Sequence, residues 1–356
     1  MKIDFFISSL SCGGAERVLV TIAKKFADQG NEVSIISLEK RPQFYSVDSK
    51  IKFHCINNND KFLSVLRDLF SISLFIKKNK ADVSISFLSR CNLIVLFASL
   101  FTKNKIIVCD RNNPQKEHSS LIFKLTHLIY KRANLINVQT EQAKSFYPKK
   151  LQKKIIVIEN PLDTEHLHSQ IKEATVRKKR ILSIGRLESQ KDFNTLISAF
   201  TKISKDYPDW TVNIFGSGND KQMLQDFITE NQMSKKIFLM GRTEQPFYEM
   251  SCSDIFVLSS FYEGFPNVLC EAMHAGCLCI SSDCDFGPKD LIKSNINGWL
   301  FPIQDVNKLA QQLKYCIEKK EQLEKIRIEA KKTVERLFLD HIAIQWNNMI
   351  QKVIGT

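Results

Sequence analysis

Hydrophobic and polar positions in the first half of the chain alternate between short apolar runs and longer amphipathic stretches. Residues 13–30 repeat apolar side chains at the spacing of an α-helix. The apolar runs are typical of buried strands, and they cover residues 2–8, 32–38, 81–88, 105–110 and 134–140. A strand and an Asn-Pro turn within residues 153–163 close the pattern. Strands that alternate with helices predict a parallel sheet covered on both faces.

The same alternation begins again at Arg180. Strands are predicted over residues 180–187, 210–218, 236–242, 254–260 and 278–283, and helices over residues 192–203, 221–230 and 267–276. We therefore expect two doubly wound α/β domains, residues 1–165 and 166–336, with a polar linker over residues 163–180. Residues 337–356 are expected to form a last helix that packs across the domain junction. Such sheets bind ligands beyond the carboxyl ends of their strands, so a cleft between two facing domains is the predicted site.

Length and composition agree with this organisation. At about 100 to 200 residues per domain, 356 residues predict two domains, and 44% hydrophobic with 25% charged side chains argues against a disordered chain. The start lacks a charged leader followed by an apolar segment, so we expect a cytoplasmic protein. The most apolar run, residues 91–101, has about half of the roughly 20 residues that a membrane-spanning helix needs, and we expect it to be a buried helix.

The cysteines and histidines do not form a metal-binding pattern. Ten cysteines are present without a C-x-x-C pair, and Cys277 and Cys279 stand in an apolar stretch, which favours reduced, packed thiols. His166 and His168 lie in a polar stretch with no acid or cysteine at ligand spacing, so we expect a surface pair. No metal is assigned to these residues.

The positive charge is concentrated in the first half of the chain. Residues 1–165 carry 26 basic and 15 acidic side chains, whereas the remainder carries 25 and 23, so the first half holds +11 of the net +13. A surface of this kind attracts a polyanion. A nucleic acid, an anionic membrane face and a phosphorylated substrate all satisfy the composition.

Two glutamates frame the segment EGFPNVLCE, which follows a predicted strand. Pro266 suits the first turn of a helix, and the free amides of Asn267 and Val268 at that helix start can donate to a phosphate. Glu271 lies about one turn inside the helix, where its carboxylate can bind both hydroxyls of a ribose. Glu263, in the loop, is left to face a sugar. Glutamates at this spacing are often solvated, but the position between strand and helix favours a site.

A second candidate segment, SIGRLESQK, places Arg186 and Lys191 directly after a predicted strand. Arginine forks onto phosphate oxygens and lysine adds a compact charge, so the two could neutralise a departing diphosphate without magnesium. That both are ordinary surface cations remains an equal alternative. Gly13 and Gly14, between the first strand and helix, allow a close approach to a phosphate or sugar, but the dinucleotide fingerprint G-x-G-x-x-G is absent.

Five motifs follow one another along the chain: GGAER, ENP at residues 159–161, GRLESQKDF, FGSG and EGFPNVLCEAMHAG. In this order and spacing they resemble the retaining GT-B glycosyltransferases of family 4, including those that build bacterial surface polysaccharides. The resemblance covers nearly the whole chain. It implies an α/β fold of two facing Rossmann-like domains, with a nucleotide sugar, expected to be UDP-linked, bound mainly by the C-terminal domain. The acceptor is bound mainly by the N-terminal domain, and neither a cofactor nor a metal is required.

The resemblance also assigns roles to individual residues. The residues that match Arg186 and Lys191 hold the diphosphate, the one that matches Glu271 holds the ribose, and the one that matches Glu263 contacts the donor sugar. It places Arg242 and Thr243 near the base. The remaining substrate contacts that it implies are Gly13, Gly14, Gly216, Gly264, Phe265, Pro266, Asn267 and Val268.

The chain departs from the family pattern after the strand at residues 105–110. Many relatives carry a histidine there, whereas this chain has Asp110 and Arg111. We expect Arg111 to bind donor hydroxyls or phosphate and Asp110 to orient it. A D-x-D at Asp283 and Asp285 resembles a metal-binding pattern of other glycosyltransferases, but it precedes a predicted helix start, where an acid commonly caps the helix. We therefore expect capping and metal independence.

The expected reaction is front-face transfer with retention, in which the diphosphate departs and the acceptor hydroxyl attacks from the same side. Residues 61–80 and 119–132 interleave apolar residues with cations, as in segments that lie on anionic membranes. The expected contacts are Lys77, Lys78, Lys80, Lys131 and Arg132. The resemblance to polysaccharide enzymes favours an undecaprenyl-diphosphate-linked acceptor at the inner face of the membrane, although an N-domain helix with solvated lysines would explain the same pattern.

Two other functions stay open at this stage. A nucleotide-sugar epimerase shares the two-domain architecture but releases a modified donor without transferring it. A non-enzymatic nucleic-acid binder would explain the charge, but it lacks aromatic-basic recognition motifs and gives no reason for the two glutamates, so no nucleic-acid partner is expected.

Overall fold

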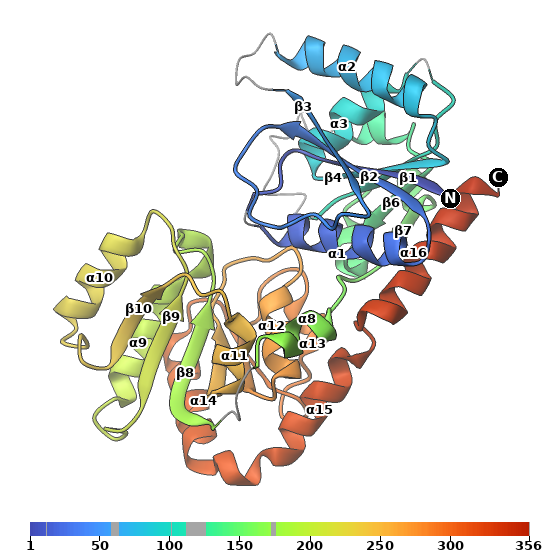
Figure 1. Cartoon of the computed structure of the whole chain (residues 1–356). Coiled ribbons are helices and arrows are strands. Elements are labelled where there is room, and N and C mark those ends of the chain that lie inside the picture. The colour runs from blue at the N-terminus through green and yellow to red at the C-terminus, as the bar shows by residue number, and fades with distance from the viewer. Residues whose placement is uncertain (12, 58–63, 101, 112–125, 172–175, 356) are drawn as a thin grey trace. The chain divides into compact units, whose positions relative to one another are not determined.

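The computed structural model describes residues 1–356 except 12, 58–63, 101, 112–125, 172–175 and 356 (Figure 1). The chain forms two compact units. Unit 1 is Met1–Pro161 with Leu339–Thr356, and unit 2 is Leu162–Phe338. The expected boundaries at residues 165 and 336 lie a few residues from these limits. The helix at the carboxyl end packs within unit 1, and its position across a domain junction stays a prediction.

Unit 1 contains a parallel sheet of seven strands in the order β3-β2-β1-β4-β5-β6-β7. The register places Phe5 opposite Ile35 on one side and Ile85 on the other, in the fully buried centre of the sheet. The strands are β1 (Lys2–Ile7), β2 (Glu32–Glu39), β3 (Lys52–Asn57), β4 (Val83–Phe87), β5 (Ile106–Cys109), β6 (Leu135–Val138) and β7 (Ile155–Val157). The prediction of a parallel sheet is confirmed. Strand β3 was not predicted, because this edge strand mixes polar and apolar residues and lacks a continuous apolar run.

Helices cover both faces of this sheet, with α1 and α16 on one face and α2 and α3 on the other (Figure 1). The predicted buried helix over residues 91–101 is α3, in which Cys91, Val95 and Leu96 are fully buried. Trp346 of α16 stacks on Phe87 of β4 with ring centroids 5.9 Å apart, which fixes the last helix on the sheet. The helices are α1 (Gly14–Asp28), α2 (Ser64–Asn79), α3 (Ser89–Ala98), α6 (Glu141–Ser145), α7 (Lys149–Gln152) and α16 (Leu339–Ile354).

Unit 2 contains a second parallel sheet, of six strands in the order β10-β9-β8-β11-β12-β13. Its strands are β8 (Lys178–Ile184), β9 (Thr211–Phe215), β10 (Ile237–Gly241), β11 (Ser253–Leu258), β12 (Leu278–Ser282) and β13 (Trp299–Phe301). Along the chain the strand order reverses at β8, which has β9 on one side and β11 on the other. Ligands of open parallel sheets bind at such a reversal, beyond the carboxyl ends of the strands.

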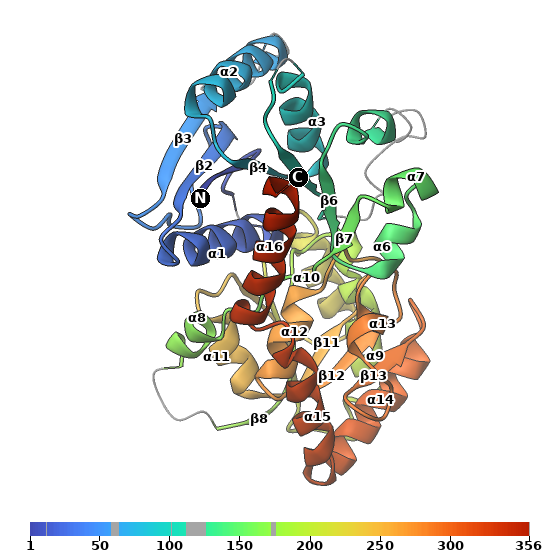
Figure 2. The same cartoon turned by 90° about the vertical axis from the view of Figure 1, so that its right-hand side faces the viewer.

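The helices of unit 2 form two layers. Helix α9 packs against α10 and α14, and α12 packs against α11 and α15 (Figure 2). Their bounds are α8 (Thr164–Ser169), α9 (Phe193–Ile203), α10 (Lys221–Glu230), α11 (Pro246–Ser251), α12 (Asn267–His274), α13 (Pro288–Leu291), α14 (Val306–Lys319) and α15 (Glu324–Glu335). The stretch predicted as a linker carries α8, because the Asp163 carboxylate accepts a hydrogen bond from the His166 amide and caps a helix there.

The burial of side chains tests the expectations for the cysteines and the histidines, and the lengths and hydropathy of the helices test for a membrane span. Cys277 and Cys279 are buried free thiols, as predicted, and burial raises the pKa of both. His166 and His168 are exposed, as predicted. Within the described part of the chain, no helix combines the length and the apolar character needed to cross a bilayer.

Candidate functional site

Three loops of unit 2 are joined at the carboxyl edge of the sheet, after β8, β11 and β12. The Gln190 carbonyl accepts the Phe261 amide at 2.9 Å, and the Gln190 side-chain amide donates to the Tyr262 carbonyl at 2.9 Å. The Ser259 hydroxyl donates to the Lys191 carbonyl at 2.8 Å. These bonds fix the loop after β8 to the loop after β11, which sit on either side of the reversal in strand order.

The loop after β11 is equally fixed to the loop after β12. The Glu263 amide donates to the Asp285 carbonyl at 3.3 Å, and the Ser282 hydroxyl donates to the Ser260 carbonyl at 2.6 Å. The backbone around Glu263 is therefore held from two sides.

Lys191 and Glu263 meet in this arrangement. The Lys191 ammonium nitrogen lies 2.6 Å from Glu263 Oε1, and only 14% and 8% of the two side chains are exposed. The Ser260 hydroxyl donates to the same Oε1 at 2.5 Å. The buried Cys284 thiol is close to this carboxylate: burial, and secondly the Glu263 charge, raise its pKa to about 12, so it stays protonated. The sequence predicted both members of the ion pair but did not distinguish Ser260 from its neighbour Ser259.

Arg186 lies on the same loop as Lys191 but is solvent-exposed. Its guanidinium contacts Glu188 at 3.1 Å and the Gln190 side-chain oxygen at 3.2 Å. Because Gln190 also contacts Tyr262, Arg186 is connected to the loop of Glu263 through one intervening side chain. The structure thus brings Arg186, Lys191 and Glu263 to one edge of unit 2.

Gly216 is required by a close approach of two loops. A Cβ atom added there would lie 1.8 Å from the Gly185 carbonyl oxygen, immediately before Arg186. Arg242, after β10, donates to the Ser217 hydroxyl at 2.6 Å, and the Thr243 hydroxyl accepts the Gln245 amide at 3.0 Å. Arg242 is therefore next to the Gly216 loop, and contact of Arg242 and Thr243 with a base stays a prediction.

Helix α12 begins at Asn267, as predicted, with Pro266 as its N-cap rather than within its first turn. The prediction of free amides at the helix start is wrong for Asn267, because its N–H donates to the Phe265 carbonyl at 3.0 Å. Glu271 is the fifth residue of α12 and is buried. A ribose contact at Glu271 and ligand contacts at Gly264, Phe265, Pro266, Asn267 and Val268 stay predictions.

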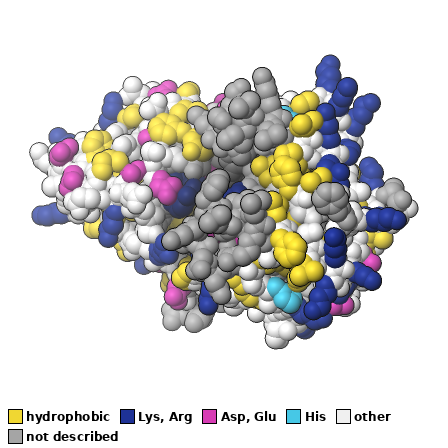
Figure 3. Space-filling view, turned by 90° about the horizontal axis from the view of Figure 1, so that it is seen from above, with side chains coloured by type: hydrophobic (Ala, Val, Ile, Leu, Met, Phe, Trp, Pro, Cys, Tyr) yellow, Lys and Arg dark blue, Asp and Glu magenta, His cyan; other side chains and the backbone are white. Residues whose placement is uncertain are grey.

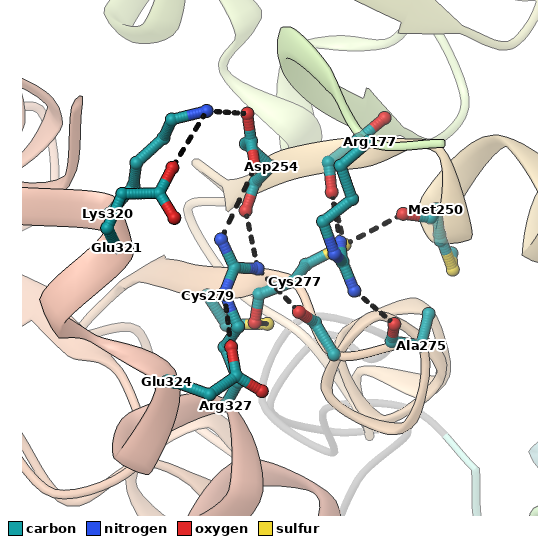
Figure 4. A network of polar contacts seen from close by, with 12 residues as sticks. Arg177, Met250, Asp254, Ala275, Cys277, Cys279, Lys320, Glu321, Glu324 and Arg327 are labelled. Atoms are coloured by element: carbon teal, nitrogen blue, oxygen red, sulfur yellow. Dashed lines mark hydrogen bonds and ion pairs between the residues drawn. The ribbon is translucent and has the colours of Figure 1, made fainter. Parts of the chain in front are cut away.

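The opposite end of α12 is anchored by two arginines (Figure 4). Arg177 donates to the Ala275 carbonyl at 2.7 Å, and Arg327 donates to the Gly276 carbonyl at 2.6 Å. Arg327 also pairs with the buried Asp254 carboxylate at 3.4 Å. Cations are favourable at a helix carboxyl terminus, where backbone carbonyls lack intrahelical partners. These contacts hold the helix that follows the Glu263 loop.

In unit 1, Gly13 is the extended N-cap of α1, and its carbonyl accepts the Tyr45 hydroxyl at 3.1 Å. A Cβ at Gly13 would collide with the Glu16 side chain, and Gly14 is the exposed first residue of the helix. Glycine therefore leaves the backbone accessible at the start of α1. Its contact with a phosphate or sugar stays a prediction.

Arg111 is buried in unit 1 with polar and aromatic partners. Its guanidinium donates to Asn160 at 2.8 Å and Asn137 at 2.7 Å, and it lies over the rings of Phe87 at 4.8 Å and Trp346 at 5.5 Å. Burial lowers the pKa of Arg111. These contacts connect β4, β6, the ENP turn and α16, which is a structural role that the sequence did not indicate. Binding of the donor by Arg111 stays a prediction.

Asp110, predicted to orient Arg111, makes different contacts. Its carboxylate accepts hydrogen bonds from Asn92 at 2.9 Å, from Tyr130 at 2.7 Å and from the Tyr147 hydroxyl. Burial and the Asp110 charge raise the pKa of Tyr130, so its hydroxyl remains a donor.

The capping role predicted for the D-x-D acids is wrong. Helix α13 has Gly287 as its N-cap without a side-chain cap, and Asp283 instead pairs with Lys289 at 3.2 Å. Among the described residues, no group of three or more histidine, cysteine and acidic side chains is arranged to hold a metal ion.

The predicted membrane contacts Lys77, Lys78, Lys80, Lys131 and Arg132 are all exposed. On α2, Phe70 and Leu74 are 72% and 57% exposed, while Ile72 and Ile76 are buried. Figure 3 shows hydrophobic side chains beside a row of lysines and arginines on the face that carries α2. Residues 58–63 and 112–125, which include parts of both proposed membrane segments, lie outside the described residues.

Comparisons with known proteins identify the family of both halves of the chain. Residues 165–333 match the family Glycosyl transferases group 1, and residues 12–166 match Glycosyltransferase Family 4. An uncharacterized glycosyltransferase of Haemophilus influenzae is 28% identical over 98% of this chain and 99% of its own length. The GalNAc-alpha-(1->4)-GalNAc-alpha-(1->3)-diNAcBac-PP-undecaprenol alpha-1,4-N-acetyl-D-galactosaminyltransferase of Campylobacter jejuni is 27% identical over 99% of each chain.

Solved structures show the same fold. HepE of Anabaena, in complex with UDP and glucose, has a TM-score of 0.79 at 19% identity, with 99% of each chain covered. The lipopolysaccharide outer core galactosyltransferase WaaB has a TM-score of 0.77 at 22% identity, again over 99% of each chain. The two parallel sheets confirm the predicted fold class, and the chain belongs to the GT-B glycosyltransferases, with a family 4 amino-terminal half and a group 1 carboxyl-terminal half.

Proposed function

We propose that this glycosyltransferase moves a hexose or N-acetylhexosamine from a UDP-linked donor to a saccharide carried on undecaprenyl diphosphate, with retention and without a metal. The observation that carries the proposal is the meeting of Lys191 and Glu263 at the carboxyl edge of β8 and β11, with Arg186 beside them. One pair of loops thereby offers cations for a diphosphate and a carboxylate for a sugar.

The chemistry follows from what each group can do. The bond between the anomeric carbon and the diphosphate breaks, and its electron pair goes to the diphosphate oxygen. Lys191 and Arg186 stabilise that growing charge, an effect worth about 3 to 4 kcal/mol per well-placed donor. The acceptor oxygen attacks the same face, and its proton passes to the departing diphosphate. Glu263 already accepts two hydrogen bonds at one oxygen, which suits a binding group better than a covalent nucleophile.

The acceptor class is supported by named relatives and by unit 1. Two Campylobacter jejuni relatives, 27% and 28% identical, are named for transfer to undecaprenol-linked saccharides. The basic first half of the chain and the exposed Phe70 and Leu74 of α2 suit an anionic membrane surface. Lys77 and Lys78 follow these two residues by seven and four positions, so cations and apolar side chains share one helix face. We therefore place the protein at the cytoplasmic face of the membrane.

Transfer of radiolabel tests the proposal. The purified chain is incubated with labelled UDP-glucose, UDP-N-acetylglucosamine or UDP-N-acetylgalactosamine and undecaprenyl-diphosphate saccharides, and we expect label in the lipid fraction. The anomeric proton coupling of the product should show the α configuration of the donor. An altered sugar that remains on UDP would instead indicate an epimerase. A thermal-shift screen of UDP, GDP and ADP sugars tests the base, and failure of every UDP sugar to bind would refute the donor assignment.

A further inference from the structure

The two oxygens of the Glu263 carboxylate accept different numbers of hydrogen bonds from neighbouring side chains. Lys191 donates to Oε1 at 2.6 Å and Ser260 donates to the same atom at 2.5 Å. Among the residues that the structure describes, none donates to Oε2. A carboxylate that is held firmly at one oxygen presents the other as an oriented acceptor.

The two donors differ in what else they can do. An ammonium group has three N–H donors, so Lys191 can give one to Glu263 and turn the others towards phosphate oxygens. Ser260 has one hydroxyl hydrogen, and it is used on Glu263. Ser260 is fully buried, and its own carbonyl accepts the Ser282 hydroxyl at 2.6 Å, so its position is set by β11 and β12. Lys191 can shift when a diphosphate binds, whereas Ser260 stays in place.

We propose that Ser260 is a positioning residue that keeps Glu263 Oε2 directed at the donor sugar while Lys191 is shared with the diphosphate. This inference rests on the proposed function. Ser260 and Lys191 both contact Glu263, but Ser260 serves the binding of the sugar and Lys191 also serves the binding of the diphosphate. Loss of Ser260 should therefore weaken recognition of the sugar and leave recognition of the nucleoside diphosphate unchanged. A residue that merely stabilised the loop would affect both halves equally.

The test compares the binding of UDP and of UDP-N-acetylglucosamine by calorimetry. Ser260→Ala should leave the Kd of UDP within about twofold and raise the Kd of the UDP sugar about tenfold, the effect of one hydrogen bond to a charged group. Ser183→Ala is the matched control, because Ser183 is also a buried serine, in strand β8, and donates to the Val257 carbonyl at 2.7 Å. That control should not change the ratio of the two constants. Equal weakening of both ligands by Ser260→Ala would overturn the proposal.

A second measurement needs no ligand and separates this inference from the donor assignment. If the unaltered chain binds neither probe, the UDP assignment fails, and a double-mutant cycle decides the role of Ser260. Ser260→Ala and Glu263→Gln should have strongly non-additive effects on the thermal unfolding midpoint, because both act at the same oxygen. Additive effects would show that Ser260 does not hold Glu263 and would overturn the inference.

Discussion

Lys191 and Glu263 form a largely buried ion pair, 2.6 Å between ammonium nitrogen and Oε1, although they lie 72 positions apart in the sequence. The group expected to hold the diphosphate therefore neutralises the group expected to hold the sugar. A donor that binds here has to share Lys191 with Glu263. Binding of the two halves of the donor is consequently coupled through one ion pair.

Replacement of Lys191 by alanine should reduce kcat about 100- to 1,000-fold, because one donor to the leaving diphosphate is lost. The structure also predicts a stability loss of up to about 3 to 5 kcal/mol, since a buried carboxylate loses its cation. Activity at saturating donor and urea denaturation measure the two effects. Lys179→Ala, which removes a half-exposed cation of β8, is the control. Near-normal turnover of Lys191→Ala would contradict the assignment.

Gly216→Ala should be more damaging than the same change at another glycine with positive φ. At Gly216 a Cβ would lie 1.8 Å from the Gly185 oxygen, whereas at Gly30, with φ of 81°, nothing lies within 4 Å. We expect a cost of about 1 to 2 kcal/mol for Gly30→Ala from backbone strain, and roughly 1 to 3 kcal/mol more for Gly216→Ala from overpacking. Nucleotide affinity should fall only in Gly216→Ala, because the loop that carries Arg186 has to move. Equal stability losses would argue against this packing.

Arg111→Ala should destabilise the protein by about 3 kcal/mol or more. The change leaves the buried side-chain oxygens of Asn137 and Asn160 without their charged donor and removes the cation from the Phe87 and Trp346 rings. Chemical denaturation measures the loss, and the exposed Arg132→Ala serves as control. A variant of normal stability with impaired donor binding would support the ligand role instead.

The free energy of unfolding should decrease as the pH is lowered, because of His274. Burial, with smaller contributions from His168 and Lys331, lowers the pKa of His274 to about 4 from an ordinary value of 6.5. Between these values the unfolded chain binds more protons than the folded one, so this contribution is complete above pH 6.5 and is lost as the pH falls towards 4. Thermal unfolding of the unaltered chain and of His274→Phe, compared over pH 4 to 7.5, isolates the effect. Parallel curves would refute it.

Membrane binding should depend on both charge and apolar contact at α2. Phe70→Ser with Leu74→Ser should reduce flotation with anionic liposomes, as should Lys77→Gln with Lys78→Gln, at about 1 kcal/mol per lysine. Ile344→Ser removes an exposed apolar side chain from α16 and should have no effect. Equal recovery with neutral vesicles would exclude electrostatic docking.

Much of the fold was predictable because its signals are local. The predicted strand at residues 254–260 contains an unbroken apolar run at residues 255–258, and the one at residues 180–187 contains Ile181, Leu182 and Ile184, as expected for strands with buried faces. The α1 segment shows helical spacing. The local sequence was misleading where more than one residue could stand at the start of the same helix. An acid before a turn suggested a helix cap at Asp283, but Gly287 takes that position and Asp283 pairs with Lys289.

The sequence by itself determined two parallel α/β sheets and placed Arg186, Lys191 and Glu263 directly after strands, because strand periodicity and loop position are readable along the chain. Only the tertiary structure decided that Lys191 and Ser260 share one oxygen of Glu263, and that Arg111 lies over Trp346. The physical reason is that these contacts depend on the parallel register of β8, β11 and β12 and on the return of α16 to the first sheet. Such pairings between distant segments leave no periodic signal in either segment alone.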